Sequence, residues 1–240
     1  MDLSVVVPVK NEEENIVPLI DEIRKALHGM DYEIVYVDDG STDGTLMRLH
    51  EVGGSFPRLR VIRHRNSCGQ STAVLTGVRH ARGNWIATLD GDGQNDPADI
   101  PRMFEKVKDC RDSGAKSLVC VCGYRRTRRD TWLRRISSRV ANGVRRGLLK
   151  DDTPDTGCGL KVFSREVFLS LPYFDHMHRF LPALFLRNGG AVVSVEVNHR
   201  ERTRGTSKYG LFNRLWVGIV DIIGVAWLQR RSRIPEIIEE

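Results

Sequence analysis

Apolar residues in the first part of the chain follow two spacings, short continuous runs and a helical repeat. Residues 3–8 and 32–37 are runs rich in β-branched side chains, which predict strands. Residues 12–27 place apolar side chains three and four positions apart, which predicts an amphipathic helix. The same patterns then predict a helix over 42–52, a strand over 59–63, a helix over 70–81 and a strand over 85–89. Strands that alternate with helices indicate an α/β fold with a mostly parallel sheet flanked by helices.

The later part of the chain continues this alternation and then departs from it. We predict a helix from 97 to about 108, a strand over 117–121, a loop and short strand over 155–165, a helical hairpin near 179–187 and a strand over 192–197. Between Trp132 and Leu148 apolar residues recur every four positions with arginines between them, which predicts a basic amphipathic helix. Two interpretations remain open for it. The helix packs on the protein's own core with solvated arginines, or it contacts lipid phosphates.

The C-terminal tail has a different character. Residues 216–228 are almost wholly apolar, lie between Trp216 and Trp227, and precede Arg230, Arg231 and Arg233. Thirteen helical residues cover about 20 Å, less than the roughly 30 Å hydrocarbon core of a bilayer, so we expect no membrane span here. We predict a C-terminal amphipathic helix that lies in the membrane interface. A core helix or a dimer contact is the alternative.

Composition narrows the class of protein only modestly. The chain has 240 residues, 40% of them hydrophobic and 28% charged, which is typical of one globular domain with a tail. The net charge of +6 indicates acidic partners: nucleic acid, phosphorylated ligands or an anionic membrane surface. Five cysteines without zinc or CxxC spacing predict reduced, mostly structural thiols, and the first residues carry no signal-peptide pattern. Together these features predict a cytoplasmic location.

Three loops at predicted strand ends carry unusual chemistry. The third loop, Asp90-Gly91-Asp92-Gly93-Gln94, offers two carboxylates and an amide oxygen at alternate positions, which suits a hard divalent cation. An EF-hand is excluded because Asn95 and Pro101 stand where that loop needs glycine and glutamate. The second loop has adjacent carboxylates, Asp38 and Asp39, that can accept hydrogen bonds from a bound nucleotide. Since no GxGxxG follows the first strand, the pattern favours a nucleoside diphosphate bridged by Mg²⁺ or Mn²⁺ over a dinucleotide cofactor.

These loops also resemble a known family. The sequences PVKNE at 8–12, VDDGSTDGT at 37–45 and LDGDGQNDP at 89–97, in this order, resemble family 2 glycosyltransferases with a GT-A, Rossmann-like fold. The segment DTGCGLK at 155–161 is similar to the D-x-x-x-G-[FL]-[RK] segment of the dolichol-phosphate mannose synthase group of polyprenyl-phosphate hexosyltransferases. The segment RTRGTSK at 202–208 is similar to their R-x-x-G-x-S-K loop. The resemblance covers residues 3–210.

Carried over position by position, the resemblance implies the following sites. The residues implied around the nucleoside are Pro8, Lys10, Glu12, Val37 and Asp39. The residues implied at the diphosphate are Asp90, Gly91 and Asp92, with Asp90, Asp92 and Gln94 as ligands of Mg²⁺ or Mn²⁺. The residues implied as a diphosphate clamp are Arg202 and Lys208, and those at the acceptor phosphate are Arg125, Arg134 and Ser138. Lys10, Cys158 and Leu160 depart from the residues most common at their positions.

The resemblance implies an inverting transfer of a hexose from GDP-mannose or a UDP-sugar to undecaprenyl or dolichyl phosphate. The acceptor phosphate is already ionised, so the harder task is stabilisation of the departing diphosphate, for which we expect Asp92, Arg202 and Lys208 to act with the metal. Asp155 is expected to position the acceptor or the sugar. The implied organisation is a nucleotide-binding half at 1–96, an acceptor-binding half at 97–208 and a membrane-interface helix and tail at 209–240, attached peripherally at the cytoplasmic face of the membrane.

Two other functions remain open at this point. A family 2 transferase that uses a saccharide hydroxyl as acceptor would need a general base, for which Asp155 is the candidate. A basic protein that binds nucleic acid through residues 125–146 is the alternative from another class, although no zinc spacing or helix-turn-helix pattern accompanies it.

Overall fold

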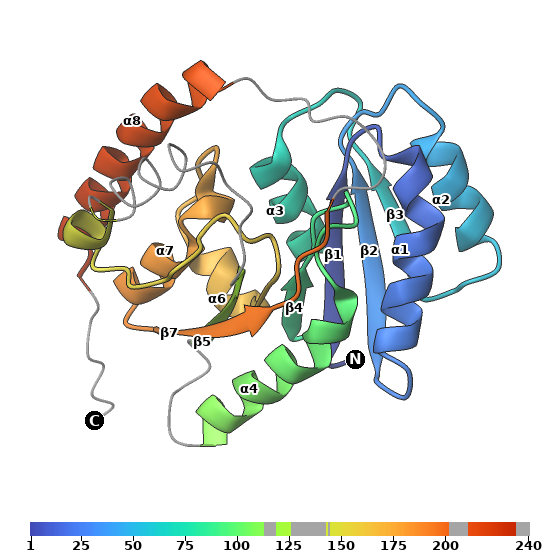
Figure 1. Ribbon diagram of the computed structural model, residues 1–240, viewed down its shortest axis with the longest axis horizontal. Coiled ribbons are helices and arrows are strands. Elements are labelled where there is room, and N and C mark those ends of the chain that lie inside the picture. The colour runs from blue at the N-terminus through green and yellow to red at the C-terminus, as the bar shows by residue number, and fades with distance from the viewer. Residues whose placement is uncertain (113–118, 126–142, 144, 202–210, 234–240) are drawn as a thin grey trace, which may run out of the picture.

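The computed structural model describes residues 1–112, 119–125, 143, 145–201 and 211–233. Its centre is a sheet of seven strands in the order β3-β2-β1-β4-β6-β5-β7 (Figure 1). The strands are β1 (Leu3–Val9), β2 (Tyr32–Asp38), β3 (Leu59–Arg63), β4 (Trp85–Thr88), β5 (Val119–Arg125), β6 (Lys161–Ser164) and β7 (Ala191–Val197). Neighbouring strands run parallel except around β6, which is antiparallel to both β4 and β5. The predicted mostly parallel α/β fold is confirmed.

Helices cover both faces of this sheet. They are α1 (Glu13–Ala26), α2 (Thr45–Gly53), α3 (Gln70–His80), α4 (Ile100–Asp112), α6 (Arg165–Ser170), α7 (Leu181–Arg187) and α8 (Leu211–Arg230), with 3-10 turns η1 (Pro97–Asp99) and η2 (Met177–Arg179). One core cluster joins the sheet to α1, α2 and α4, and a second joins it to α3, α6, α7 and α8. The protein therefore has three layers, with the sheet between two helical layers.

The side-chain alternation of a strand explains the two clusters. In β1, Leu3, Val5 and Val7 belong to the cluster beneath α1, whereas Val6 belongs to the cluster beneath α3. All four side chains are fully buried. A strand buried on both faces reads as a continuous apolar run, which is the pattern that the sequence shows here.

Several predicted elements differ from those in the structure. The strand predicted over 117–121 is β5, which extends to Arg125. The predicted hairpin near 179–187 is one helix, α7, preceded by the turn η2. Helix α6 was not predicted, and it begins where the Ser164 side chain accepts a hydrogen bond from the Val167 N–H. Such short helices carry too few residues to show a hydrophobic period.

Helix α8 is longer than the predicted tail helix. It begins at Leu211 and has 20 residues, which corresponds to about 30 Å, so the helix length predicted from the apolar run alone was too short. None of the helices in the described part of the chain is both long and apolar enough to cross a membrane. Val225 is buried against the domain, whereas Ile223 and Trp227 are exposed, so apolar side chains lie on more than one side of the helix. The predicted amphipathic character is not confirmed.

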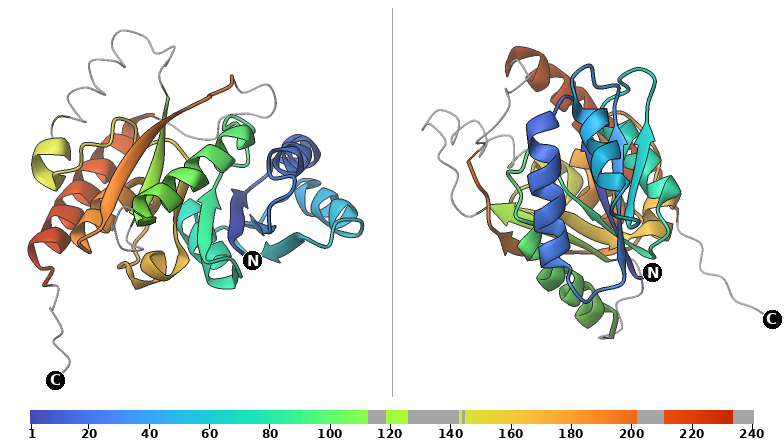
Figure 2. Two further views of the ribbon diagram at one scale, coloured as in Figure 1. Left: turned by 90° about the horizontal axis from the view of Figure 1, so that it is seen from below. Right: turned by 90° about the vertical axis from the view of Figure 1, so that its right-hand side faces the viewer.

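Helix α8 and α7 lie at the end of the molecule away from α1 and α2, as two views show (Figures 1 and 2). The antiparallel strand β6 connects these two ends within one sheet. Its first residue, Lys161, pairs with Thr88 at the end of β4 and with Cys122 in β5. The segment that precedes β6 therefore reaches the same edge of the sheet as the segment that follows β4.

Candidate active site

The loops that follow β1 and β2 are bound to each other. The Asn11 N–H donates to Ser41 Oγ at 2.9 Å, and the Thr42 N–H donates to Asn11 Oδ1 at 2.7 Å. The Glu12 N–H donates to Thr45 Oγ1 at 2.9 Å, at the first residue of α2. Asn11 has a φ of 51°, a left-handed conformation that asparagine tolerates better than most residues. These bonds hold the two loops in one fixed arrangement at the C-terminal edge of the sheet.

The predicted nucleoside residues at this edge have different environments. Pro8 lies near the end of β1, and Lys10 is exposed just beyond it. The Glu12 carboxylate accepts a hydrogen bond from Asn15 Nδ2 at 2.8 Å, which orients it along α1. Val37 is fully buried, and its side chain belongs to the core cluster beside α3 and not to the surface of the loops.

The two carboxylates of the second loop are held by separate networks. Asp38 is fully buried, and its Oδ1 accepts the Ser41 N–H at 2.9 Å. Asp39 accepts four hydrogen bonds at 2.7 to 2.9 Å, from His64 Nδ1, Ser67 Oγ, and the N–H groups of Cys68 and Gly69. Burial alone would raise the pKa of Asp39, but these hydrogen bonds, led by that from Cys68, hold it below the ordinary value. Asp39 therefore stays ionised and fastens the segment before α3 to the end of β2.

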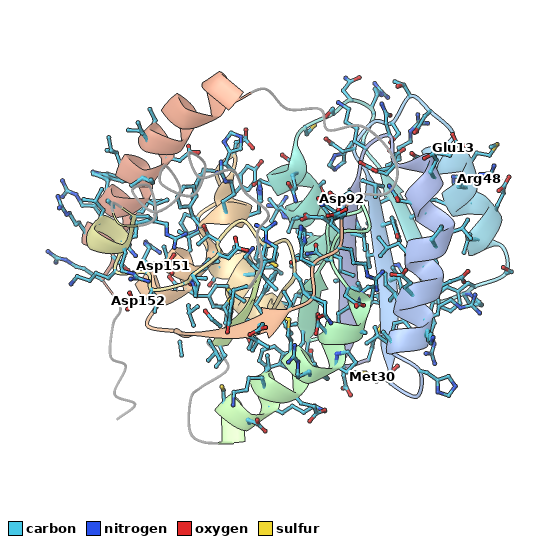
Figure 3. All side chains as sticks on the ribbon, viewed as in Figure 1. Glu13, Met30, Arg48, Asp92, Asp151 and Asp152 are labelled. Carbon is cyan, nitrogen blue, oxygen red and sulfur yellow. The ribbon has the colours of Figure 1, made fainter. Side chains whose placement is uncertain are left out.

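The Asp90–Gln94 segment follows β4 at the same edge, where Figure 3 labels Asp92. The Asp92 carboxylate accepts the Gln94 N–H at 3.1 Å, and Gly93 between them has a φ of 73°, which favours glycine. Gly91 packs so closely on β1 that a Cβ there would lie 2.3 Å from Val9 Cγ1. The segment therefore lies directly against the end of β1.

Asp90 has the most perturbed environment of these carboxylates. Its Oδ1 accepts a hydrogen bond from Gln70 Nε2 at 2.8 Å, at the first residue of α3. Burial and the neighbouring charge of Asp92 raise the pKa of Asp90 to about 6, and the opposing effects of Lys161, Gln70 and Arg125 limit the rise. Two carboxylates that repel each other in a partly buried place are arranged as they would be around a cation.

A second segment closes over the predicted metal ligands. The Arg200 N–H donates to the Gln94 carbonyl at 2.9 Å, and Gln94 Nε2 donates to the Arg200 carbonyl at 3.3 Å. The Arg200 guanidinium reaches Asp96 at 2.8 Å and Glu22 of α1 at 2.7 Å. Residues 199–200 thus hold the predicted ligand Gln94 by its amide nitrogen.

Asp155 and Arg125 form an ion pair. Arg125 Nε and Nη2 donate to the two carboxylate oxygens of Asp155 at 2.5 and 2.9 Å, and the pKa of Arg125 rises because this pairing outweighs its burial. A carboxylate held by two charge-assisted hydrogen bonds is a poor proton acceptor. The pair therefore fits a positioning role for Asp155 better than a role as a general base.

The loop before β6 packs directly against the side chain of Asp90. A Cβ at Gly159 would lie only 2.2 Å from Asp90 Oδ2, so the carboxylate rests directly on the Gly159 backbone. Thr88 Oγ1 fixes that backbone by donating to the Gly159 carbonyl at 2.7 Å. Buried Lys161 donates to the carbonyls of Cys158 and Thr156 and adds a positive charge near Asp90.

The donor set at this edge fits a hard divalent cation. Asp90 and Asp92 offer carboxylates, and Gln94 offers an amide oxygen because its hydrogen bond to Arg200 uses the nitrogen. Mg²⁺ and Mn²⁺ prefer such oxygen ligands. A cation there would also offset the repulsion between Asp90 and Asp92.

Only the end of the predicted basic helix lies within the described residues. Arg145 is buried, contacts Asp151 at 3.6 Å and donates to the Thr153 carbonyl, and burial lowers its pKa. Arg146 pairs with Asp152 at 2.9 Å, and both side chains are exposed. Figure 3 labels Asp151 and Asp152. Arg145 therefore holds the helix to the loop that follows it. The sequence pattern suggested that the arginines of this helix are solvated or contact lipid phosphates, and Arg145 does neither.

Comparison with known proteins decides which family these loops represent. Residues 4–171 match the sequence profile of Glycosyl transferase family 2. The chain belongs to this family. The relationship predicted from the three strand-end loops is thereby confirmed.

Curated relatives of this family 2 glycosyltransferase are similar over most of its length. The chain is 35% identical to the dodecaprenyl-phosphate galacturonate synthase of Rhizobium johnstonii over 98% of this chain and 69% of the relative. It is also 35% identical to the undecaprenyl-phosphate 4-deoxy-4-formamido-L-arabinose transferase of Edwardsiella ictaluri, over 87% of this chain and 63% of the relative. The chain thus spans about two thirds of the length of these relatives.

Solved structures show the same fold. Glucosyl-3-phosphoglycerate synthase of Mycobacterium tuberculosis, in complex with Mg²⁺ and UDP, matches 98% of this chain and 80% of its own with a TM-score of 0.67 and 21% identity. A second structure of that enzyme, with Mn²⁺, UDP and glucosyl-3-phosphoglycerate, matches with a TM-score of 0.67 and 22% identity, over 98% of this chain and 81% of that chain. At this identity the likeness concerns the fold alone.

Four predicted residues of the glycosyltransferase lie outside the described residues, namely Arg134, Ser138, Arg202 and Lys208. The structure adds contacts that the predicted site did not include. Gln70 and Gly159 contact Asp90 directly, and His64 contacts Asp39. Gly159 and Lys161 lay within a quoted motif, whereas nothing in the local sequence around Gln70 or His64 indicates a partner so far along the chain.

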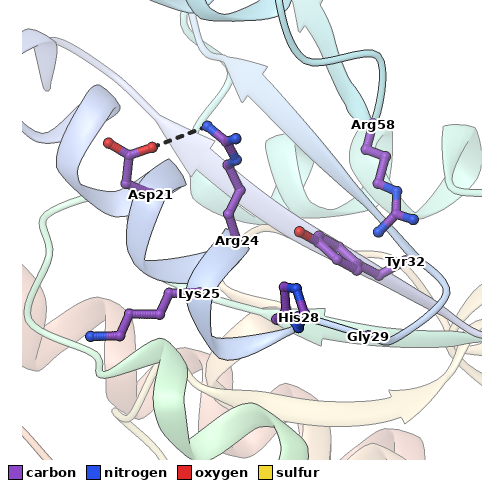
Figure 4. Close-up of a pocket in the computed structure, with 7 residues that line it drawn as sticks. All are labelled: Asp21, Arg24, Lys25, His28, Gly29, Tyr32 and Arg58. Atoms are coloured by element: carbon purple, nitrogen blue, oxygen red, sulfur yellow. Dashed lines mark hydrogen bonds and ion pairs between the residues drawn. The ribbon is translucent and has the colours of Figure 1, made fainter.

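A hollow of about 520 Å³ lies at the opposite edge of the sheet, near the start of β2 (Figure 4). Its lining residues are Asp21, Arg24, Lys25, His28, Gly29, Tyr32 and Arg58. The basic side chains gather at the C-terminal end of α1, where they complement the helix dipole. No predicted site residue lines it.

Proposed function

We propose that this chain transfers a sugar from a nucleotide-diphosphate donor to a polyprenyl phosphate at a membrane surface. The observation that carries the proposal is the group of Asp90, Asp92 and Gln94 at the end of β4, next to the loops of β1 and β2. Both curated relatives are named as enzymes that act with a polyprenyl phosphate. The structural neighbours bind UDP with Mg²⁺ or Mn²⁺.

In this proposal the described residues have separate tasks. The bonded loops around Asn11 and Asp39 form the nucleoside side, and Asp90, Asp92 and Gln94 would hold Mg²⁺ or Mn²⁺ against the diphosphate. The metal would supply charge neutralisation as the nucleoside diphosphate departs. Arg202 and Lys208 are expected to add cationic contacts to the same group, as the resemblance implies. Direct in-line attack by the acceptor phosphate then inverts the anomeric centre.

The Arg125–Asp155 pair favours a phosphate acceptor over a saccharide hydroxyl. A hydroxyl acceptor needs a base, and Asp155 is held by a guanidinium at 2.5 Å. An ionised phosphate needs none. Arg125 then brings a positive charge to the acceptor side, and Asp155 sets the direction of its guanidinium.

The test of the proposed function combines acceptor, metal and a matched pair of variants. A panel of GDP- and UDP-sugars is incubated with undecaprenyl or dolichyl phosphate, with and without Mn²⁺, and labelled product is extracted into organic solvent. Asp92→Asn should reduce transfer about 100-fold or more, whereas the exposed Asp109→Asn on α4 should not change it. Transfer by Asp92→Asn at the wild-type rate with saturating Mn²⁺ would contradict the assignment, and product that stays in water would favour a saccharide acceptor.

Membrane attachment through α8 is part of the same proposal. Val220, Ile223 and Trp227 are each more than half exposed, and Arg230, Arg231 and Arg233 follow at the end of the helix. An apolar surface with a basic end suits an anionic lipid surface. Peripheral attachment at the cytoplasmic face, as predicted from the sequence, belongs to this proposal.

Liposome flotation tests the attachment. Trp227→Asp should release the protein from vesicles that contain anionic lipid, while Met47→Asp should not, because Met47 is equally exposed but lies on α2 at the other end of the molecule. Equal flotation of both variants would show that this face of α8 does not bind lipid.

A further inference from the structure

The hollow at the start of β2 is lined mostly by basic side chains (Figure 4). Arg24 and Lys25 come from the last turn of α1, His28 follows that helix, and Arg58 comes from the turn before β3. Among the described residues that line the hollow, Asp21 alone is acidic. Three positive charges therefore face one negative charge, with His28 neutral. The volume of about 520 Å³ lies within the range of pockets that bind small molecules.

The helix dipole explains only part of this positive charge. Cations in the last turn of α1 offset the partial negative charge at its C-terminus, which accounts for Arg24 and Lys25. Arg58 belongs to no helix and reaches the same hollow from another part of the chain. Asp21 pairs with Arg24 at 3.3 Å, but within the described residues no carboxylate pairs with Lys25 or Arg58. The hollow thus keeps a surplus of positive charge that an anion would offset.

Aromatic rings fix the two guanidinium groups and leave most of their N–H donors available. Arg58 Cζ lies 5.0 Å from the centroid of the Tyr32 ring, and Arg24 Cζ lies 4.8 Å from that of the Phe56 ring. Contact with a ring face orients the plane of a guanidinium group without using its donors. In the described part of the chain each group makes one hydrogen bond, Arg58 to the Met30 carbonyl at 3.3 Å and Arg24 to the carboxylate of its ion pair. A guanidinium group has five N–H donors, so most remain for a ligand.

From this arrangement we propose that the hollow binds a small anion with two linked phosphate groups, such as inorganic pyrophosphate or the diphosphate of a free nucleotide. Arg24 and Arg58 lie on either side of Tyr32 (Figure 4), so each can receive one phosphate group in a two-point contact. Lys25 and His28 add further N–H donors at the border of the hollow. The protein's own cations balance the charge of such an anion, so binding there needs no metal.

The aromatic rings beside the hollow are already covered. Tyr32 is 3% exposed and lies beneath Arg58, and the Phe56 ring lies beneath Arg24. Neither ring can therefore stack on a nucleobase, and recognition rests on the phosphate groups. We expect pyrophosphate, UDP and GDP to bind with closely similar affinity. A stacked base would make one nucleotide bind about 10-fold or more tightly than pyrophosphate.

This site lies apart from the proposed transfer site and differs from it in its need for metal. The hollow is at the edge of the sheet where β2 begins, whereas Asp90 and Asp92 follow the end of β4. Binding to the hollow can be measured in EDTA, without sugar donor or lipid. Failure of the proposed transfer would therefore leave this measurement unaffected.

Isothermal titration calorimetry of the full chain with pyrophosphate in EDTA tests the proposal. We expect one site per chain, with an affinity that falls as salt is added. Arg24→Gln and Arg58→Gln should each weaken binding about 10-fold or more, because each removes a charged donor. Arg58→Lys should recover part of the loss, since it restores the charge without the two-point contact. Bound pyrophosphate should also slow acetylation of Lys25, followed on its own peptide by mass spectrometry.

Lys106→Gln on α4 is the matched control, because it removes the same charge from a half-exposed side chain outside the hollow. It should bind pyrophosphate as the wild type does. The melting temperature of each variant shows whether it is folded, and Lys25 protection in the wild type tests the site even where Arg58→Gln unfolds. Lack of saturable binding by the wild type would overturn the proposal, and so would an equal loss in Lys106→Gln or unchanged acetylation of Lys25. Binding of RNA without binding of pyrophosphate would also overturn it, in favour of a macromolecular partner.

Discussion

Gly159→Ala should lower the rate of sugar transfer while the protein remains folded. The new Cβ would lie 2.2 Å from Asp90 Oδ2, whereas ordinary contacts begin near 3.4 Å, so the carboxylate must retreat by about 1.2 Å. The Gly159 backbone is anchored through its carbonyl to Thr88, so Asp90 is the group that moves. A displacement of about 1 Å in a catalytic constellation can cost about 100-fold in rate. We therefore expect transfer to fall about 100-fold and the Mn²⁺ concentration for half-maximal activity to rise.

The fold should survive this change. Gly159 does not have a left-handed φ, so alanine can adopt its backbone conformation, and the clash falls on the Asp90 side chain and not on the backbone. Gly53→Ala is the matched control, because its Cβ would meet only Leu59 Cδ2 at 4.0 Å at the end of α2. Melting temperature, transfer rate and Mn²⁺ dependence are measured for both variants. Wild-type rate and Mn²⁺ dependence in Gly159→Ala would refute the placement of Asp90 at the metal.

Two further predictions concern groups around the same sheet. Gln70→Ala removes the hydrogen bond that orients Asp90, so Mn²⁺ affinity should fall by roughly 10-fold while the melting temperature changes little; an unchanged Mn²⁺ titration would contradict this. Buried Glu33 accepts hydrogen bonds from Arg82 N–H, Ser4 and Arg60, which hold its pKa below the ordinary 4.5 despite burial. Its ionised form therefore stabilises the fold above about pH 4.5, and this contribution is lost as the pH falls through the lowered pKa. Urea unfolding across this range should show a large difference between wild type and Glu33→Gln at neutral pH that shrinks in acid, and a difference independent of pH would be inconsistent with this role.

The sequence predicted the positions of the three loops well, because periodic apolar runs locate strands and the C-terminal ends of parallel strands meet at one edge. It did not predict what the loop side chains contact. Asp39 is held by residues that follow another strand, and Asp155 is held by Arg125, thirty positions away along the chain. Such contacts depend on how strands are ordered in the sheet, and no local pattern records that order.

The length of helix α8 is a second feature that the sequence did not predict correctly. The apolar run begins at Trp216, but the helix begins at Leu211 because backbone hydrogen bonding continues through Asn213 and Arg214. A continuous apolar run marks the apolar part of a helix, and it underestimates a helix whose first turn contains polar residues such as Asn213 and Arg214. The error concerned the length of the helix alone, because no helix in the described part of the chain is both long and apolar enough to cross a membrane.

The reversed direction of β6 has a consequence for how specificity can change. Because β6 runs antiparallel to β4, the loop that enters it comes to the same edge as the loop that leaves β4, although more than sixty residues separate them. In the proposed function, the donor side and the acceptor side are thus encoded by separate stretches of the chain, and these stretches meet where Asp90 contacts Gly159. We expect related transferases to exchange lipid or sugar acceptors through changes before β6 while the nucleotide loops stay intact. The residues at the contact between Asp90 and Gly159 should then vary least among these transferases.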